Sequence, residues 1–597
     1  MASEPTSPLP GHVRSLLRIA AAAFRAEPLL VVASLVLTPL GGLAGPVAAL
    51  WLRSLADAAL DRSTPPAITA AIGLVATLAG AELLTVLQRR LQRDLQDRLA
   101  SVMQPWFAGT AAGISGIEHL ERPEHVDRLE VVRDNSWYLC WSFETLAEVL
   151  TVAVQLAATA VLLARVEPLL LLFALLGIPA GVAARAAATG AGRATEAMAG
   201  RERGVRHLLG LVSVPEPAAE LRVFGLSAEV IRRIGALHGE HDRGILGAVW
   251  RGALFQTVAA LTLAAGYGGA LAVVGLAVLA HRAQPGDLLL TALLLASLNG
   301  VVLGAAAVLA AWLQMQAVVR RMVWLDDRLA DDRRRLEGTS TSPERGVVRL
   351  ERVSFTYPGA GRQVLRGIDL ELRPGRIVAL VGENGAGKTS LAKLLLRLYE
   401  PTGGRITVGG VPLDRIEPAS WRRLCSGAFQ DVTRFETSLG EAVALGRLQP
   451  EAAEEEVLAA LGRAGAGDLA SNLPGGLGAQ LGARWPGGVD LSGGQWQKLG
   501  LARCLLRGSP ALLILDEPTS ALDADTEHAI FRGFAEAGRR AGMATLLISH
   551  RFSTTREADL IAVLEGGRIT ELGGHAELMG RQGTYARLYR IQAGAYA

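Results

Sequence analysis

The segment GENGAGKTS at residues 382–390 has the residue types of a phosphate-binding loop. It follows an apolar run that ends at Val381, and a helix is expected to begin near Lys388. In this context glycines let backbone amides curl around phosphates, the lysine supplies positive charge, and the Thr389 hydroxyl suits Mg²⁺. The predicted loop residues are Gly382, Asn384, Gly385, Gly387, Lys388, Thr389 and Ser390.

A pair of acids follows a second apolar run further along the chain. The segment ALLILDEP ends in Asp516 and Glu517. The carboxyl ends of strands are where α/β folds bind their ligands. Asp516 is therefore predicted to hold Mg²⁺ through water, and Glu517 to orient or deprotonate an attacking water. A strand that ends in acids by chance fits poorly with the phosphate loop upstream.

The segment LSGGQWQKLGLAR at residues 491–503 resembles a second phosphate loop, because a serine and two glycines precede an expected helix. One chain thus carries two loops suited to phosphate, about a hundred residues apart. The elements around them must explain this duplication.

The second half of the chain reads as an α/β domain. VRLERVSFTY, IVALVGE, ALLILDEP and ATLLISH are typical of strands, and KTSLAKLLLRLY is typical of a helix. Such alternation predicts a nucleotide-binding fold with a mostly parallel sheet. The charged and then Ser-, Thr-, Gly- and Pro-rich stretch before it marks a boundary near Gly338–Gly346.

The first half contains long apolar runs without charges, and a bilayer core requires roughly 20 apolar residues in a helix. Arg or Asp at a helix centre costs ~3 kcal/mol, so runs of this kind insert readily. Six buried helices of this length in a soluble protein would be unusual. We therefore expect six transmembrane helices, over Pro28–Leu52, Ser63–Ala81, Val149–Ala164, Pro168–Ala184, Gly252–Ala280 and Leu288–Val319.

Arginine-rich connections give the orientation of these helices. The segment before the first run and the long connections after the second and fourth runs are rich in arginine, whereas the other connections are short. The positive-inside rule then places both termini and both long loops in the cytoplasm. Each long loop contains a short amphipathic segment, HLERPEHVDRLEVVRD and AAELRVFGLSAEVIRR. These segments are either solvated connecting helices or docking sites for a cytoplasmic domain.

Composition excludes other classes of protein. The net charge of +3 over 597 residues gives no global signal for nucleic-acid binding. The three cysteines are widely spaced, which favours free thiols over a disulfide framework or a zinc site.

The carboxylates Glu144 and Glu148 stand near the expected cytoplasmic end of the third helix, and contact with substrate is the less favoured interpretation for them.

The order of motifs resembles the ATP-binding cassette (ABC) family, and with six preceding helices the chain resembles an ABC exporter half-transporter. The resemblance covers almost the whole chain from about residue 15 and implies ATP and Mg²⁺ as cofactors, a second half-transporter as partner, and alternating access. It implies that Tyr357 stacks on adenine, that Gln430 senses Mg²⁺ and that His550 contacts the γ-phosphate. It further implies a signature of Ser492, Gly493, Gly494 and Gln495 that faces ATP on the other subunit, and a D-loop at Asp523.

One segment departs from the family pattern. Many exporters have a VGERG-like segment before the signature, whereas this chain has LGARWPGGVD with Ala483 in place of the glutamate. Contacts with the loops of the membrane domain would then be built differently, through Arg484 or Trp485. Lys393 and Lys498 follow their motifs on helices, and ordinary surface or structural roles suffice for them.

These observations predict an all-α transmembrane domain joined to an α/β ABC ATPase domain in a bacterial cytoplasmic membrane. The expected function is ATP-driven export of a hydrophobic or amphipathic small molecule, peptide or lipid. Lipid flipping, import of a siderophore or vitamin, and ATP-gated sensing remain alternatives, and a homodimer is favoured over a heterodimer. The expected organisation is a tail at 1–15, a membrane domain at 16–337, a linker at 338–346 and an ATPase domain at 347–597.

Overall fold

A computed structural model describes the chain from residue 21 onward, apart from residues 22–23, 26, 136–141, 175–203, 340–344, 448–450, 519–523 and 597. The chain divides into two compact units. One comprises residues up to 111 together with 127–327, and the other contains 112–126 and 328 onward. We call them the helical unit and the ATPase unit.

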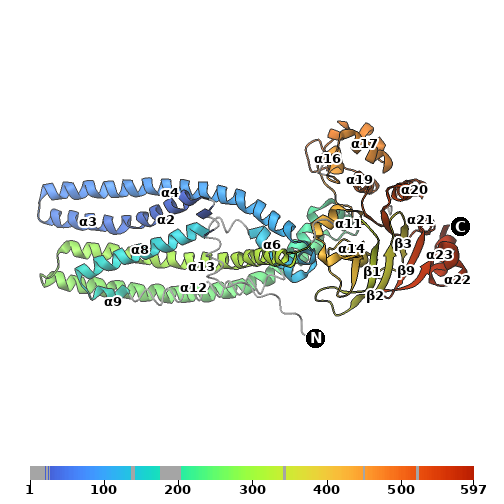
Figure 1. The fold of residues 1–597 in the computed structure, drawn as a ribbon. Coiled ribbons are helices and arrows are strands. Elements are labelled where there is room, and N and C mark those ends of the chain that lie inside the picture. The colour runs from blue at the N-terminus through green and yellow to red at the C-terminus, as the bar shows by residue number, and fades with distance from the viewer. Residues whose placement is uncertain are drawn as a thin grey trace. The chain divides into compact units, whose positions relative to one another are not determined.

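The helical unit is built of long helices, as the apolar runs predict (Figure 1). Within the described residues, four helical stretches are long and apolar enough to cross a membrane: Pro28–Leu60, Thr64–Gly113, Thr145–Val166 and Val249–Leu279. The sixth predicted run lies inside helix α13, Pro285–Arg335. Most of the fourth predicted run falls outside the described residues, after α9 at Leu170–Ala174. The helices that carry these stretches are α2 (Pro28–Gly42), α3 (Ala44–Leu60), α4 (Thr64–Gly113), α8 (Ser142–Val166) and α12 (Ser227–Leu279).

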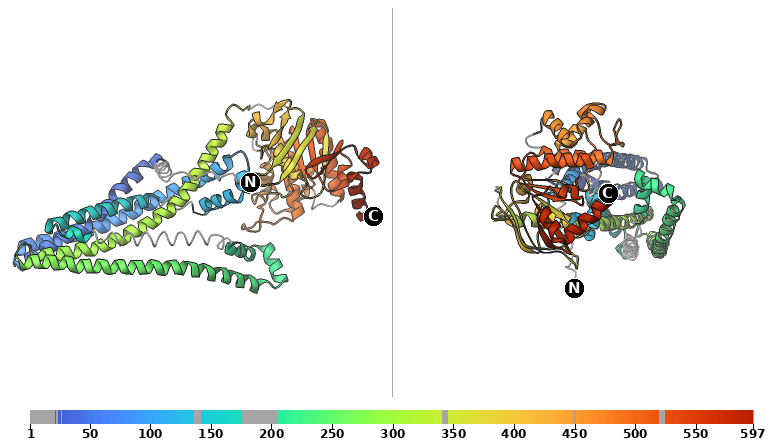
Figure 2. Two further views of the ribbon diagram at one scale, coloured as in Figure 1. Left: turned by 90° about the horizontal axis from the view of Figure 1, so that it is seen from below. Right: turned by 90° about the vertical axis from the view of Figure 1, so that its right-hand side faces the viewer.

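Apolar side chains from several helices pack near the end of the helical unit where the turn between α12 and α13 lies. Leu163 of α8, Val274 of α12 and Leu294 of α13 are fully buried in one cluster. At the same end of the unit, the Arg53 guanidinium on α3 lies 2.9 Å from the Asp287 carboxylate at the start of α13. Helices α12 and α13 are joined by a short turn and form a hairpin (Figure 2). Close packing of apolar side chains and the Arg53–Asp287 ion pair therefore link these helices.

The ATPase unit contains two sheets. The larger has the strand order β10-β9-β3-β8-β7-β6, in which β3 pairs in parallel with β8 and β9, and β7 with β6 and β8. The smaller is antiparallel, in the order β2-β1-β4-β5. The strands are β1 (Val348–Thr356), β2 (Gln363–Leu372), β3 (Ile377–Val381), β4 (Gly403–Val408), β5 (Val411–Pro412), β6 (Cys425–Ala428), β7 (Leu512–Asp516), β8 (Ala544–Ile548), β9 (Leu560–Glu565) and β10 (Arg568–Gly573).

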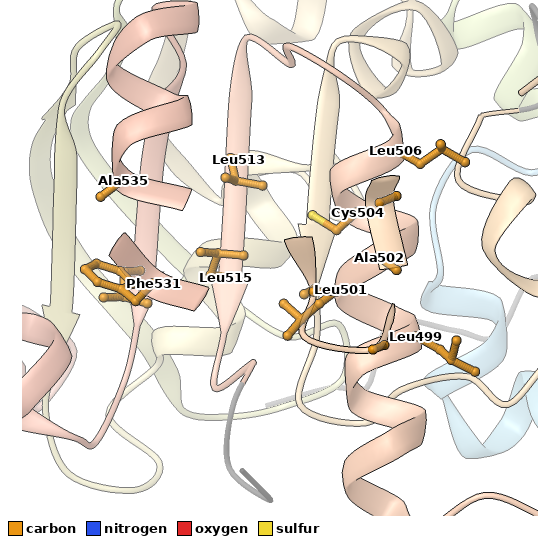
Figure 3. Close-up of a cluster of buried hydrophobic side chains, with 14 of the residues drawn as sticks. Leu499, Leu501, Ala502, Cys504, Leu506, Leu513, Leu515, Phe531 and Ala535 are labelled. Carbon is orange, nitrogen blue, oxygen red and sulfur yellow. The ribbon is translucent and has the colours of Figure 1, made fainter. Parts of the chain in front are cut away.

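Both faces of the parallel sheet are covered, which explains why its central strands are almost wholly apolar. Every residue of β3, β7 and β8 is buried. On one face Leu513 and Leu515 of β7 pack against α19 (Gly493–Leu506) and Phe531 of α20 (Ala524–Ala541) (Figure 3). The opposite face packs against α14 (Lys388–Leu395) and the antiparallel sheet.

Shorter helices complete the ATPase unit. In the two long loops of the chain lie α5 (Glu118–Glu121), α6 (Pro123–Asn135) and α11 (Pro215–Val223); α11 and residues 127–135 of α6 belong to the helical unit. The remaining helices are α15 (Pro418–Arg423), α16 (Leu439–Ala444), α17 (Glu454–Arg463), α18 (Gly467–Asn472), α21 (Phe552–Thr555), α22 (His575–Arg581) and α23 (Thr584–Tyr596).

Candidate nucleotide site

The phosphate loop lies between β3 and α14, with the boundaries that its sequence predicts. Strand β3 ends at Val381 and α14 begins at Lys388. Gly387 caps the helix at φ +108, and a side chain there would meet Leu365 at 2.8 Å. Only glycine fits this backbone without strain. The amino end of α14, where the helix dipole and free N–H groups favour an anion, therefore faces the loop.

The Lys388 ammonium folds over this loop. Its Nζ donates to the carbonyl of Gly382 at 2.8 Å and to that of Glu383 at 3.0 Å. Burial lowers the pKa of Lys388, while the carboxylates of Glu517 and Asp516 oppose that shift. The ammonium is thus held at the centre of the loop. A phosphate that binds there would replace the two carbonyls as its hydrogen-bond partner and form charge-assisted bonds with it.

Neighbouring strand ends bring the predicted acids and the histidine together. Because β3, β8 and β7 are adjacent and parallel, the residues after them meet at one edge of the sheet. Asp516 Oδ2 accepts from the Thr389 hydroxyl at 3.1 Å. His550 Nε2 lies 2.9 Å from Glu517 Oε1.

The backbone of Glu517 is fixed in an unusual conformation. Its φ is +48, in the left-handed region that non-glycine residues rarely occupy. Its N–H donates to the carbonyl of Ile548 at 2.9 Å, which ties the turn after β7 to the end of β8. Strain of this kind costs of order 1–3 kcal/mol and is concentrated at functional sites. Here it aims the carboxylate at His550.

Two further predicted residues lie around this edge. Gln430 is exposed just after β6, the strand next to β7. Tyr357 follows β1, and its hydroxyl lies 2.9 Å from Ser390 Oγ, directly after the Lys–Thr pair of the loop. The adenine-stacking candidate and the phosphate loop are therefore in contact.

The signature segment forms the exposed amino end of α19, which is closed by a capping box. Ser492 is the N-cap of α19: its hydroxyl accepts from Gln495 N at 3.3 Å, and its own N–H donates to Gln495 Oε1 at 2.8 Å. Ser492 and Gly493 are exposed. Among the described residues, no hydrogen bond or ion pair joins this segment to the phosphate loop of the same chain. Its helix amino end is available for an anion held elsewhere.

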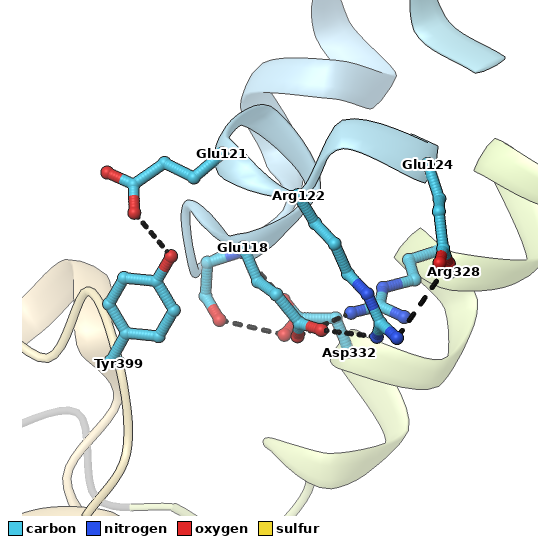
Figure 4. A network of polar contacts seen from close by, with 8 residues as sticks. Glu118, Glu121, Arg122, Glu124, Arg328, Asp332 and Tyr399 are labelled. Atoms are coloured by element: carbon cyan, nitrogen blue, oxygen red, sulfur yellow. Dashed lines mark hydrogen bonds and ion pairs between the residues drawn. The ribbon is translucent and has the colours of Figure 1, made fainter. Parts of the chain in front are cut away.

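The first long loop, which follows α4, contacts the ATPase fold, as the docking interpretation predicts. Ile117 N donates to the Leu398 carbonyl at 3.3 Å, just before α5. Glu118 of α5 pairs with Arg328 at 2.7 Å, and Ser115 binds Asp332 through both its N–H and its hydroxyl (Figure 4). The loop thereby binds both the ATPase domain and the carboxyl-terminal end of α13.

The segment LGARWPGGVD forms a loop supported by Glu436. Trp485 Nε1 donates to Glu436 Oε2 at 3.1 Å, while half of the Trp485 side-chain surface is exposed. The proposed role of Arg484 or Trp485 in contacts with membrane-domain loops stays a prediction.

The motifs predict residues that the structure brings together around the loop, but they do not predict the contacts between segments far apart in the sequence. Asp523 lies outside the described residues. Lys393, for which the sequence predicts only an ordinary surface or structural role, has its Nζ 2.5 Å from Glu121 of α5. The only sequence signal for this contact is that lysine is rare in the chain.

Comparison with known proteins agrees with the geometry. Residues 365–520 match the family model described as "ABC transporter". The chain is 41% identical over 267 residues to the ATP-dependent lipid A-core flippase of Pseudomonas aeruginosa, covering 45% of this chain and 43% of the relative. It is 42% identical over 252 residues to the mitochondrial potassium channel ATP-binding subunit of Rattus norvegicus, covering 42% and 34%. The matched region is thus less than half the length of these curated relatives.

A solved structure extends the likeness to both units. The structure of a bacterial Atm1-family ABC exporter with ATP bound matches with a TM-score of 0.69 and 25% identity, over 95% of this chain and 99% of that chain. The phosphate loop, the acids after β7 and the capped signature helix stand in the order typical of ABC ATPases. Residues 365–520 therefore belong to an ABC ATPase domain, and the chain has the architecture of an ABC exporter half-transporter, a helical membrane domain followed by that ATPase domain.

Proposed function

We propose that the chain is one half of an ATP-driven exporter that works as a dimer by alternating access. The observation that carries this proposal is the separation of two phosphate-binding elements within one ATPase unit. The phosphate loop adjoins Asp516, Glu517 and His550, whereas Ser492 caps an exposed helix start without a bond to that loop. Two chains would complete two ATP sites, each with the loop of one chain and the signature of the other.

Each residue then has a role in hydrolysis. Lys388 and the amides of the loop would bind the β- and γ-phosphates, Glu517 would orient or deprotonate the attacking water, and His550 would hold the γ-phosphate. Tyr357 would stack on adenine, Gln430 would sense the metal, and Asp523 would bridge the subunits. The segment formed by Ser492, Gly493, Gly494 and Gln495 would close on the ATP of the partner subunit.

The oxygen atoms of Thr389 and Asp516 fit a Mg²⁺ ion, because the hydroxyl and the carboxylate lie 3.1 Å apart beside the loop. Hard oxygen ligands of this kind are those that Mg²⁺ prefers. Bound there, the ion would neutralise charge on the β- and γ-phosphates. Burial raises the pKa of Asp516, an effect that the hydrogen bond from Thr389 opposes. Thr389 thus helps to keep this carboxyl ionised and able to bind a cation.

The second cytoplasmic tip would dock on an ATPase unit of the partner. Val223 and Phe224, at the end of α11, are 81% and 66% exposed. The ATPase unit has a cavity of about 360 Å³ that is lined mainly by apolar atoms, including Leu396 and Phe429. Exposed apolar side chains and an apolar groove complement each other. Intact motifs in this chain favour a homodimer, and a second, different half-transporter is the alternative.

The cargo is proposed to be a hydrophobic or amphipathic small molecule, peptide or lipid. Lipid movement is favoured by the relatives named lipid A-core flippases, which match less than half of this chain. The proposed location is a bacterial cytoplasmic membrane with both termini in the cytoplasm, supported by bacterial relatives and by the arginine-rich loops.

Transport by the purified protein in inside-out vesicles tests the proposal. ATP-dependent accumulation of a labelled amphipath, lost in the Glu517→Gln variant, would support export. A change in leaflet exposure of labelled lipid would identify a flippase. Uptake by cells without accumulation in such vesicles would instead indicate import. ATP hydrolysis that responds to no solute or lipid would count against transport and favour a sensor.

A further inference from the structure

Helix α5 is connected to the adenine-stacking candidate through two residues. Glu121, at the end of α5, accepts from the Tyr399 hydroxyl at 2.6 Å through one carboxylate oxygen. Its other oxygen lies 2.5 Å from Lys393 Nζ. Figure 4 shows Glu121 reaching toward Tyr399 from the first cytoplasmic loop. One carboxylate therefore fixes two side chains of the ATPase fold at once.

The same two side chains pack against Tyr357. The rings of Tyr357 and Tyr399 lie 5.3 Å apart, edge to face at 84°. The Lys393 ammonium lies 5.7 Å from the Tyr357 ring centre and 5.9 Å from that of Tyr399. Edge-to-face pairs and cations near aromatic rings are both favourable arrangements. The orientation of Tyr357 thus depends on groups that Glu121 holds.

Protonation states agree with this arrangement. Burial raises the pKa of Tyr399, and its hydrogen bond to Glu121 raises that pKa further. Tyr399 is therefore a neutral phenol that donates to the carboxylate. Loss of the carboxylate would leave the hydroxyl without its acceptor and the Lys393 ammonium without its counter-ion.

Helix α5 is also tied to the end of a membrane helix. Glu118, one turn before Glu121, pairs with Arg328 near the end of α13. Ser115 binds Asp332 of the same helix at 2.9 and 2.8 Å, through its N–H and its hydroxyl. Any restraint placed on α5 by Tyr399 and Lys393 therefore reaches α13 through direct bonds.

We propose that Glu121 is a positioning residue that couples adenine stacking on Tyr357 to the docking of α5, through Lys393 and Tyr399. The proposal rests on the adenine-binding role proposed for Tyr357. Coupling of this kind is reciprocal: if the docked α5 orders Tyr357 for adenine, bound adenine must strengthen the docking of α5 by the same factor. Binding of the adenine base, and not only of the phosphates, would then affect the docking of α5 and through it the membrane domain.

Nucleotide binding to the full-length protein in detergent tests this inference. In a Glu517→Gln background, Glu121→Ala should weaken ATP binding about threefold to tenfold. It should leave binding of inorganic tripolyphosphate, which has no base, unchanged. Glu121→Gln should weaken ATP less, because the amide oxygen still accepts from Tyr399. Glu124→Gln, a change at an exposed residue on the next helix, is the matched control and should leave both ligands unaffected.

The path through Tyr357 has its own test. In a Tyr357→Ala background, adding Glu121→Ala should cause no further loss of ATP affinity. In hydrogen exchange, ATP should slow the amide of Ile117, which bonds to Leu398, and this slowing should vanish in Tyr357→Ala. Equal weakening of ATP and tripolyphosphate, or losses that add in the double variant, would overturn the coupling. These binding measurements do not depend on transport. Failure of the export proposal would appear in the vesicle assay and would leave the binding results unchanged.

Discussion

His550 Nε2 and Glu517 Oε1 lie 2.9 Å apart at the ends of two adjacent parallel strands. Burial lowers the pKa of His550, and the nearby charge of Lys388 lowers it further, whereas Glu517 opposes the shift. The imidazole is therefore neutral at pH 7 and can donate its Nε2–H to the carboxylate. This contact orients the carboxylate of Glu517, the group proposed as general base.

Replacement of Glu517 by glutamine should separate ATP binding from hydrolysis. The amide keeps the shape of the side chain but cannot accept the proton of the attacking water. We expect turnover to fall by a factor of about 10² to 10⁴ with ATP affinity nearly unchanged. Steady-state phosphate release and equilibrium binding of labelled ATP measure the two effects. Near-normal turnover in the purified variant would refute the role of Glu517.

The pH profile of ATP hydrolysis should have its acid limb below the ordinary histidine pKa of 6.5. Because the pKa of His550 is lowered, the neutral imidazole persists as pH falls through 6.5, and hydrolysis is lost only at more acidic pH. By linkage, the contribution of neutral His550 to the free energy of unfolding is fully present above pH 6.5. It is lost as the pH falls toward the lowered pKa. Initial rates of ATP hydrolysis between pH 5 and 8 test whether the acid limb lies below pH 6.5, with His550→Gln as the comparison. A limb centred above 6.5 would contradict it.

Mg²⁺ dependence should shift when the Thr389 hydroxyl is removed. Thr389→Val retains a β-branched side chain of similar size but loses the bond to Asp516, and with it one oxygen ligand. We expect the variant to require about tenfold more Mg²⁺ for half-maximal hydrolysis. Chelation with EDTA should abolish hydrolysis in the parent protein. A Mg²⁺ titration identical to that of the parent would exclude Thr389 as a ligand.

Gly482 should be required for the loop that carries Trp485. Its φ is +95, and a side chain there would lie 2.7 Å from Glu436, the residue that binds the Trp485 indole. We expect Gly482→Ala to lower the free energy of unfolding by about 1–3 kcal/mol. Gly478→Ala is the matched control, because its side chain would meet nothing within 4 Å. Thermal unfolding of both variants measures the difference, and equal melting temperatures would argue against the strain.

Local motifs explain why so much of the phosphate site could be predicted. The loop after β3 and the acids after β7 are each encoded by one continuous segment, and parallel pairing then brings them together. Contacts such as Lys393 with Glu121, or Ser115 with Asp332, join residues more than two hundred positions apart. No periodicity marks such pairs, because each side chain is ordinary within its own stretch of sequence. Long apolar runs likewise predicted helices but not which faces pack.

The central claim is that each ATP site combines the phosphate loop of one chain with the signature of another. Two differently tagged chains, both Glu517→Gln, would be purified as mixed dimers and assayed for occluded ATP. With Lys388→Ala in one chain and Ser492→Arg in the other, we predict about one occluded ATP per dimer, because one composite site remains intact. With both changes in the same chain, we predict none. The reverse ranking would show that each chain completes its own site and would contradict the account.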